Sequence, residues 1–198
     1  MMKEKEIRKI DMQFRAESDD DGEMRIKGYA AVFNSPETYG YTEVIDPKAF
    51  DEADMSDVVL RYNHNDSFMV LARTRNKSLK LDVDKKGLFM DAFLQKNITD
   101  HVNVYNAIDS ELIDKQSFAF TVEEDAYDYD TDTRTITKIG KLFDVSVVDQ
   151  PFYNATDVSV ARNAENSDFL ERREQLRKEH EAKKALEAAK EKLLKKLD

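Results

Sequence analysis

Residues 115–120, Lys-Gln-Ser-Phe-Ala-Phe, and residues 142–148, Leu-Phe-Asp-Val-Ser-Val-Val, carry the clearest strand signal in the chain. In the first stretch two phenylalanines alternate with smaller residues, as they do on a strand with one face in a core. The second stretch is an apolar run interrupted by one carboxylate, Asp144. Because an unpaired buried charge is costly, Asp144 needs a partner there, and a histidine N–H is a suitable one.

The chain up to about residue 165 shows many short segments in which apolar and polar residues alternate. The alternation predicts strands over residues 10–16, 24–33, 57–62, 69–75, 78–83, 88–94, 117–123, 134–139, 143–148 and 157–160. Residues 84–87, Asp-Lys-Lys-Gly, predict a hairpin turn. Two segments break the pattern: residues 47–53 predict a short helix that Asp46 would cap, and residues 98–113 have a helical period. The pattern indicates a mainly β chain with helical insertions, an α+β class, built as a barrel or a sandwich.

The composition changes near Asn163, and we expect two parts, residues 1–163 and 164–198. Residues 166–198 hold ten Lys/Arg and eight Asp/Glu, which leaves 21 basic and 33 acidic residues in the rest of the chain. This tail is rich in strong helix formers and carries a narrow apolar stripe, so we expect one long helix over 168–197. Two interpretations stay open for it: a solvated extension, or a segment that self-associates or docks on a scaffold.

The composition, the net charge and the absence of long apolar runs exclude several classes of protein. The 198 residues include no cysteine, which excludes disulfides, thiolate metal sites and a cysteine nucleophile. The formal net charge of −10 argues against a nucleic-acid partner for the body of the protein. No apolar run approaches the roughly 18 residues of a membrane span, and the first residues resemble no secretory signal, so we expect a soluble intracellular protein without a membrane partner.

Three polar residues stand where chemistry is possible. His64 follows an apolar strand and lies among polar residues, which suits a general base in a cleft. Ser117 begins a predicted core strand, and Asp144 interrupts another. Each has an ordinary structural explanation when taken singly. Together they supply a nucleophile, a base and an orienting carboxylate.

The other polar signals are weaker. His101 falls near the start of the predicted helix, where a structural role is expected, and His180 falls in the charged tail, where we expect it to be solvated. The acidic stretch 123–132 resembles the start of a calcium loop, but Thr133 replaces the required glycine, so an exposed hairpin tip is expected instead. The histidines lack metal-ligand spacing, and the isolated glycines form no phosphate loop, so neither a metal nor a cofactor is expected.

Five segments in order resemble the prohead, or capsid maturation, proteases of tailed bacteriophages, over about residues 8–162. They are residues 28–34 (Gly-Tyr-Ala-Ala-Val-Phe-Asn), 43–50 (Glu-Val-Ile-Asp-Pro-Lys-Ala-Phe), 63–66 (Asn-His-Asn-Asp), 115–120 and 142–148. The resemblance implies a serine endopeptidase whose fold is related to the herpesvirus assemblin protease, an antiparallel β-barrel wrapped by helices. It implies that His64 is the general base, that Ser117 is the nucleophile and that Asp144 is the third residue. His101 in place of Asp144 would make the site resemble the herpesvirus Ser-His-His type.

Two positions depart from the family's pattern. Ala119 replaces a glycine that commonly follows the Ser-Phe pair, which could change the backbone beside the nucleophile. Asn65 separates His64 from an aspartate that commonly follows it directly. Neither departure removes a catalytic group, so we expect activity.

The resemblance also implies partners. Such proteases act inside the immature prohead in the host cytoplasm, where they cleave the scaffold protein, the major capsid protein and commonly themselves. A homo-oligomer is expected, and the charged tail fits a scaffold-docking segment. Two other interpretations stay open: a catalytically silent relative that serves assembly, and a β-barrel binding module with a coiled-coil tail.

Overall fold

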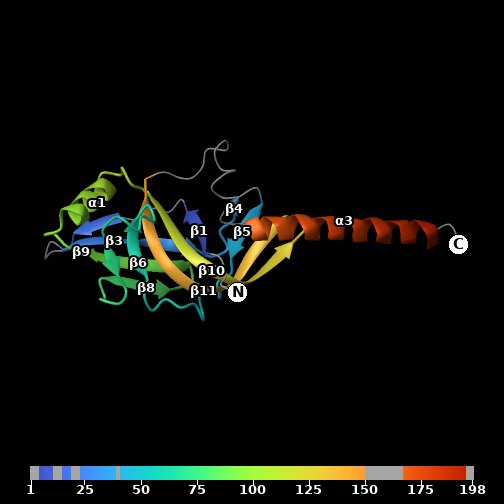
Figure 1. The fold of residues 1–198 in the computed structure, drawn as a ribbon, viewed down its shortest axis with the longest axis horizontal. Helices are drawn as coiled ribbons and strands as arrows, with labels where there is room; N and C mark the ends of the chain where they lie inside the picture. Colours follow the sequence, from blue (N-terminus) through green and yellow to red (C-terminus); the bar gives the residue numbers. More distant parts are fainter. Residues whose placement is uncertain (1–4, 11–14, 19–22, 39–40, 150–166, 195–198) are drawn as a thin grey trace.

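The computed structural model of the protein has two β-sheets and a long C-terminal helix that projects away from both sheets (Figure 1). The structure describes residues 5–10, 15–18, 23–38, 41–149 and 167–194. The expected mainly β class with helical insertions is confirmed, with helix α1 (Thr99–Asp109) inside the region 98–113 that has a helical period. The predicted strand over 157–160 and the boundary at residue 163 lie outside the described residues.

The larger sheet is organised around two long strands, β10 (Lys115–Asp128) and β11 (Thr133–Val148), which pair antiparallel. Strand β1 (Lys5–Ile10) pairs with the free side of β10. On its other side β11 pairs in parallel with β5 (Thr42–Ile45) near its start and with β6 (Val59–Tyr62) near its end. Two short strands, β4 (Glu37–Thr38) and β7 (Ala72–Arg73), extend β5 and β6.

The smaller sheet is antiparallel and has the order β2 (Arg15–Ser18), β3 (Met24–Val32), β9 (Gly87–Leu94) and β8 (Leu79–Val83). Helix α1 packs on it through contacts with β2, β3 and β9. The predicted turn between β8 and β9 is confirmed: the Asp84 carboxylate accepts the backbone N–H groups of Lys86 and Gly87, at 2.7 and 3.0 Å. Gly87 is required, because a Cβ there would lie 2.0 Å from the Ala31 carbonyl oxygen.

One apolar cluster joins the two sheets. It contains Ile26 and Met90 from the smaller sheet and Leu60, Phe118 and Phe120 from the larger one, all fully buried. The rings of Phe118 and Phe120 stack with centroids 4.8 Å apart. Burial of each such side chain contributes about 1.5–3 kcal/mol, so this cluster holds β10 and β11, which carry the site, against the rest of the fold.

The predicted barrel is wrong: the two sheets do not close. In the described part of the chain, β1 pairs only with β10, β2 only with β3 and β8 only with β9. The fully antiparallel arrangement is also wrong, because β5 and β6 run parallel to β11. Alternation along a strand reports that one face is buried, and it is the same in a barrel and in a pair of open sheets; closure depends on which edges pair.

The predicted short helix over 47–53 is also wrong. Residues 47–52 form consecutive turns, with Ala49 N–H donating to the Asp46 carbonyl and Ala53 N–H to that of Phe50. The segment is held instead by β11, since Ile139 N–H donates to the Ala49 carbonyl at 2.8 Å. The Asp46 carboxylate caps a turn, accepting the N–H of Lys48 at 2.8 Å.

A buried group of charges lies where β1, β5, β10 and β11 meet. Arg134 Nη1 lies 2.8 Å from Glu6 Oε2 and 3.1 Å from Glu43 Oε2, and its Nε lies 2.8 Å from Asp125 Oδ2. Arg8 pairs with both Glu6 and Glu43. Burial alone would lower the pKa of Arg134, but the carboxylates of Glu6 and Glu43 outweigh it and raise that pKa, so the guanidinium stays charged.

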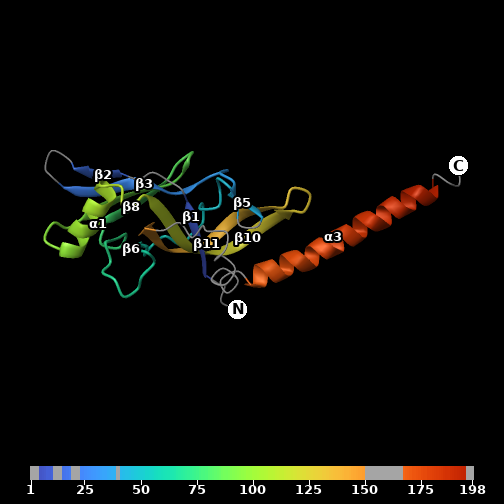
Figure 2. The same ribbon diagram turned by 90° about the horizontal axis from the view of Figure 1, so that it is seen from above.

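Helix α3 (Ser167–Leu194) occupies the segment where the long helix was expected, and residue 197 lies outside the described chain. Figure 2 shows it leading away from the sheets, with its C-terminal end farthest from them. Its first half contacts the tip of the β10–β11 hairpin: Arg173 Nη2 lies 2.6 Å from both carboxylate oxygens of Asp132, and Arg172 Nη2 lies 2.8 Å from Asp125 Oδ1. Leu176 and Leu186 of this helix are exposed.

Candidate active site

His64 is placed by a tight turn at the end of β6. Asn63 and His64 have φ values of 53° and 54°, in the left-handed region that disfavours most side chains but tolerates asparagine. The turn is fixed to β11 because Asn63 N–H donates to the Val147 carbonyl at 3.0 Å and the Asn63 side chain accepts the N–H of Asp149 at 3.2 Å. Two consecutive residues in this region cost of order 1–3 kcal/mol each, which the surrounding pairing must offset.

Ser117 and Asp144 come to one face of the β10–β11 pair through its register. Ser117 lies opposite Ser146, and Ala119 lies opposite Asp144. Since side chains alternate along a strand, all four point to the same side of the sheet. Ser117 and Asp144 are therefore diagonal neighbours, far enough apart for an imidazole ring to fit between them.

The ring of His64 occupies that space. Its Nε2 lies 2.6 Å from Ser117 Oγ, and its Nδ1 lies 2.5 Å from Asp144 Oδ1. The three residues proposed from the sequence are thus brought into one chain of contacts, hydroxyl to imidazole to carboxylate. His101 does not join it: this side chain accepts the N–H of Gln95 at 3.0 Å and lies 3.2 Å from the Val70 carbonyl.

The site is almost closed to solvent. Ser117 has no exposed surface, Asp144 is 2% exposed, and the His64 side chain is 11% exposed. Burial by itself would raise the pKa of Asp144, but the hydrogen bond and charge of His64, together with Lys5, outweigh it and lower that pKa. Asp144 is therefore a carboxylate able to hold the Nδ1–H of His64.

Three residues make contacts at the site that were not predicted from the sequence. Ser146 Oγ, also buried, donates to Asp144 Oδ1 at 3.0 Å and lies 3.2 Å from His64 Nδ1. Lys5 Nζ donates to Asp144 Oδ2 at 3.1 Å. The Arg8 backbone carbonyl accepts the hydroxyl of Ser117 at 2.7 Å. Ser146 could have been found, because it follows Asp144 by two residues on a strand and so shares its face.

The two departures from the family's pattern have defined places. Ala119 is fully buried in β10 and is not among the described residues with positive φ, so its backbone does not need glycine's freedom. Next to it the β10–β11 register shifts, between Ala119 and Phe120. Asp66, which follows Asn65, is exposed and pairs with Arg61 at 3.0 Å, and the carboxylate that contacts His64 is that of Asp144.

The other sequence candidates lie elsewhere. The acidic stretch 123–132 includes the tip of the β10–β11 hairpin, but it is less free than expected because α3 contacts it. His180 is half-buried, not solvated: its ring stacks on Tyr129 with centroids 5.1 Å apart. Within the described residues no three His, Asp or Glu side chains are grouped so as to hold a metal ion.

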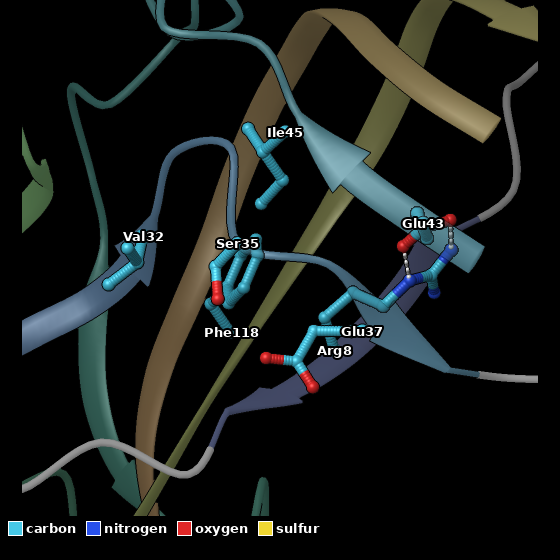
Figure 3. A pocket seen from close by; sticks show the side chains of 7 residues that line it. All are labelled: Arg8, Val32, Ser35, Glu37, Glu43, Ile45 and Phe118. Carbon is cyan, nitrogen blue, oxygen red and sulfur yellow. Dashed lines mark hydrogen bonds and ion pairs between the residues drawn. The ribbon is translucent and has the colours of Figure 1, made fainter. Parts of the chain in front are cut away.

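A pocket opens on the other face of β10 and contains none of the three site residues (Figure 3). It is lined by Arg8, Val32, Ser35, Glu37, Glu43, Ile45 and Phe118. Phe118 neighbours Ser117 on the strand and therefore points the opposite way. Figure 3 shows the Arg8 guanidinium engaged by the Glu43 carboxylate at one end of this pocket.

A serine hydroxyl, an imidazole and a carboxylate in contact in this order are the groups that serine hydrolases use. Comparison with known families identifies the class: residues 11–169 match the caudovirus prohead serine protease family, and the chain belongs to that family. The protein is therefore a serine protease of the capsid maturation type, as the resemblance implied. Neither the curated proteins nor the solved structures provide a match, so the expected likeness to herpesvirus assemblin stays a prediction. None of the described helices has the length and apolar character needed to cross a membrane.

Proposed function

We propose that Ser117 is the nucleophile, His64 the general base and Asp144 the orienting carboxylate of this prohead protease. The observation that carries the proposal is the continuous set of contacts Ser117 Oγ–His64 Nε2 and His64 Nδ1–Asp144 Oδ1. Among the described residues, no other serine contacts the Nε2 atom of a histidine. Because the chain belongs to a serine protease family, Ser117 is therefore the candidate nucleophile.

The geometry supports a two-step acyl transfer. Ser117 Oγ attacks the carbonyl carbon of the scissile peptide while its proton passes to His64 Nε2. Asp144 holds the Nδ1–H and stabilises the imidazolium that forms. His64 then gives the proton to the leaving amine, and water, activated by the same ring, hydrolyses the acyl-enzyme and returns Ser117 to its starting state.

The substrates proposed for this chemistry are the scaffold protein, the major capsid protein and the protease itself. The place of action is the interior of the immature prohead in the host cell. Helix α3, with Leu176 and Leu186 exposed, is the proposed self-association or scaffold-docking segment, and residues 1–163 form the proposed catalytic domain.

A serine-directed fluorophosphonate tests the nucleophile without knowledge of the cleavage site. We expect it to label the intact protein at Ser117 and not to label Ser117→Ala. Incubation of each form with scaffold and capsid proteins, followed on a gel, then tests the substrates. A protein that is labelled at no serine, even in assembled proheads, would instead be a catalytically silent assembly relative.

A further inference from the structure

Strand β1 lies directly against the proposed nucleophile. In the antiparallel ladder between β1 and β10, Lys9 is the partner of Ser117 and Arg8 is the partner of Phe118. The Arg8 carbonyl oxygen accepts a hydrogen bond from Ser117 Oγ at 2.7 Å, and Ser117 has no exposed surface. The chain's own backbone therefore occupies the place beside the hydroxyl where a substrate must come.

The contact also competes for the one proton that Ser117 carries. His64 Nε2 at 2.6 Å and the Arg8 carbonyl at 2.7 Å are both acceptors within reach, and a hydroxyl can donate to only one of them fully. A serine that donates to Arg8 does not give its proton to His64, and an unactivated serine is a weak nucleophile. The contact thus favours a resting state.

The Arg8 carbonyl group also excludes a substrate sterically. Attack requires a substrate carbonyl carbon about 3–3.5 Å from the nucleophilic oxygen. The Arg8 carbonyl oxygen already lies in contact with that atom, and its carbonyl group belongs to a peptide fixed in a ladder of six residue pairs. A second peptide cannot enter until this one leaves.

We propose that β1 is an internal block of the active site, and that an extended peptide substrate takes its place along β10 when β1 detaches. The proposal rests on the proposed role of Ser117. An extended peptide is the ligand that fits, because a strand edge binds through main-chain hydrogen bonds and needs a partner strand. In this proposal β1 covers the active site until the protein meets its substrate in the assembled prohead.

The fold makes detachment of β1 feasible. β1 is an edge strand, and β10 is its one strand partner in the described part of the chain, so no other ladder breaks. Its two buried charges, Glu6 and Arg8, contact each other and leave as a neutral pair. Glu43 and Asp125 keep their contacts with Arg134. Asp144 gives up its contact with Lys5 but keeps its hydrogen bonds with His64 and Ser146.

A reversible crosslink between β1 and β10 tests the block. Ile7 and Ala119 are register partners, whose Cα atoms in an antiparallel pair lie about 5 Å apart, within reach of a disulfide. Since the chain has no cysteine, the double variant Ile7→Cys/Ala119→Cys forms one defined bond. Its reduced form is the matched control for any effect of the substitutions themselves.

We expect fluorophosphonate labelling of Ser117 to be slower by about tenfold or more in the oxidised form and to recover with reductant, because the rate follows the open fraction. Equal labelling rates in the two forms would overturn the block. No labelling in either form, nor in the unmodified chain within proheads, would overturn the role of Ser117 instead.

A second variant is designed to make β1 detach more easily. Glu6→Ala/Arg8→Ala removes both buried charges of β1 together, so it weakens the hold on β1 without leaving either charge of that pair behind. We expect faster labelling of Ser117 than in the unmodified chain, at a temperature where circular dichroism shows both to be folded. Labelling that is unchanged or slower in the folded variant counts against the block.

Discussion

Ser117 and Ser146 lie directly opposite each other on the antiparallel pair β10–β11, and both hydroxyl groups contact the ring of His64, one at each nitrogen. The ring therefore contacts side chains from both of these neighbouring strands. Asp144, two residues before Ser146 on β11, accepts hydrogen bonds from both His64 and Ser146 on the same oxygen.

Ser146 is predicted to position the pair formed by His64 and Asp144. A hydrogen bond to a charged group is worth about 1.5–3 kcal/mol, so Ser146→Ala is expected to slow labelling of Ser117 by roughly ten- to a hundredfold. Ser146→Thr, which keeps the hydroxyl, is expected to recover much of the rate. In an Asp144→Asn background the effect of Ser146→Ala is expected to shrink, because both changes act on one contact. Independent, additive effects would contradict this role.

The three triad residues are predicted to differ in what their loss costs. Ser117→Ala and His64→Ala are each expected to lower kcat by on the order of 10⁶, and Asp144→Asn by about 10⁴, by analogy with other triads. The measurement is cleavage of scaffold and capsid proteins, with thermal unfolding as the control for the fold. Full activity of Ser117→Ala would remove the nucleophile assignment.

Arg134 is predicted to be the least replaceable charge outside the site. It is 2% exposed and contacts Glu6, Glu43 and Asp125. Arg134→Met leaves buried carboxylates short of a cation, and breaking such a group costs about 3–5 kcal/mol. Urea unfolding checks this loss. Arg177→Met on the exposed face of α3 is the control, and a comparable loss there would contradict the special role of Arg134.

Glu6 is predicted to make stability depend on pH in the acid range. Burial would raise the pKa of its carboxyl, but Arg8 and Arg134 outweigh it and lower that pKa below the ordinary 4.5. A lowered pKa in the folded state means that the stabilisation is fully present above the unfolded value and is lost as pH falls through the folded one. Glu6→Gln is therefore expected to show a smaller loss of unfolding free energy than the unmodified chain between about pH 5 and 3. Glu187→Gln, exposed on α3, is the control and should follow the unmodified chain.

The contact between His64, Ser117 and Asp144 was predicted more closely than the arrangement of the sheets. Taken singly, each residue has a structural explanation; the expectation that they meet came from the resemblance of their segments to the prohead proteases, and their catalytic roles stay a proposal. The strand β5 was missed because its four residues, with buried Glu43 among them, do not stand out as a strand. The two strands predicted over 134–139 and 143–148 are one, since Gly140 reads as a break although it continues β11.

Contacts between distant parts of the chain could not be predicted in this way. Residues 8 and 117 are 109 positions apart, and nothing in either segment specifies that β1 pairs with β10 in the register that places Arg8 on Ser117. The same holds for closure of a barrel, which depends on edge strands finding partners. Local pattern fixes the faces of strands, while tertiary pairing decides their neighbours.

Helix α3 is predicted to serve assembly and not catalysis. Among the described residues, its contacts with the body include the β10–β11 hairpin, at Asp125, Asp130 and Asp132 and the tyrosines beside them, and Tyr41. An exposed helix of this kind is marginal alone in water, so it is expected to find a partner, either the same helix of another copy or a scaffold protein.

A chain that ends at Asn163 is therefore expected to keep the fluorophosphonate labelling rate of Ser117 and to lose self-association or incorporation into proheads. Light scattering and prohead sedimentation measure the two losses. The control is a full-length chain with Glu187→Gln, which keeps the helix. Normal incorporation together with an unchanged oligomeric state in the shortened chain would leave α3 a solvated extension.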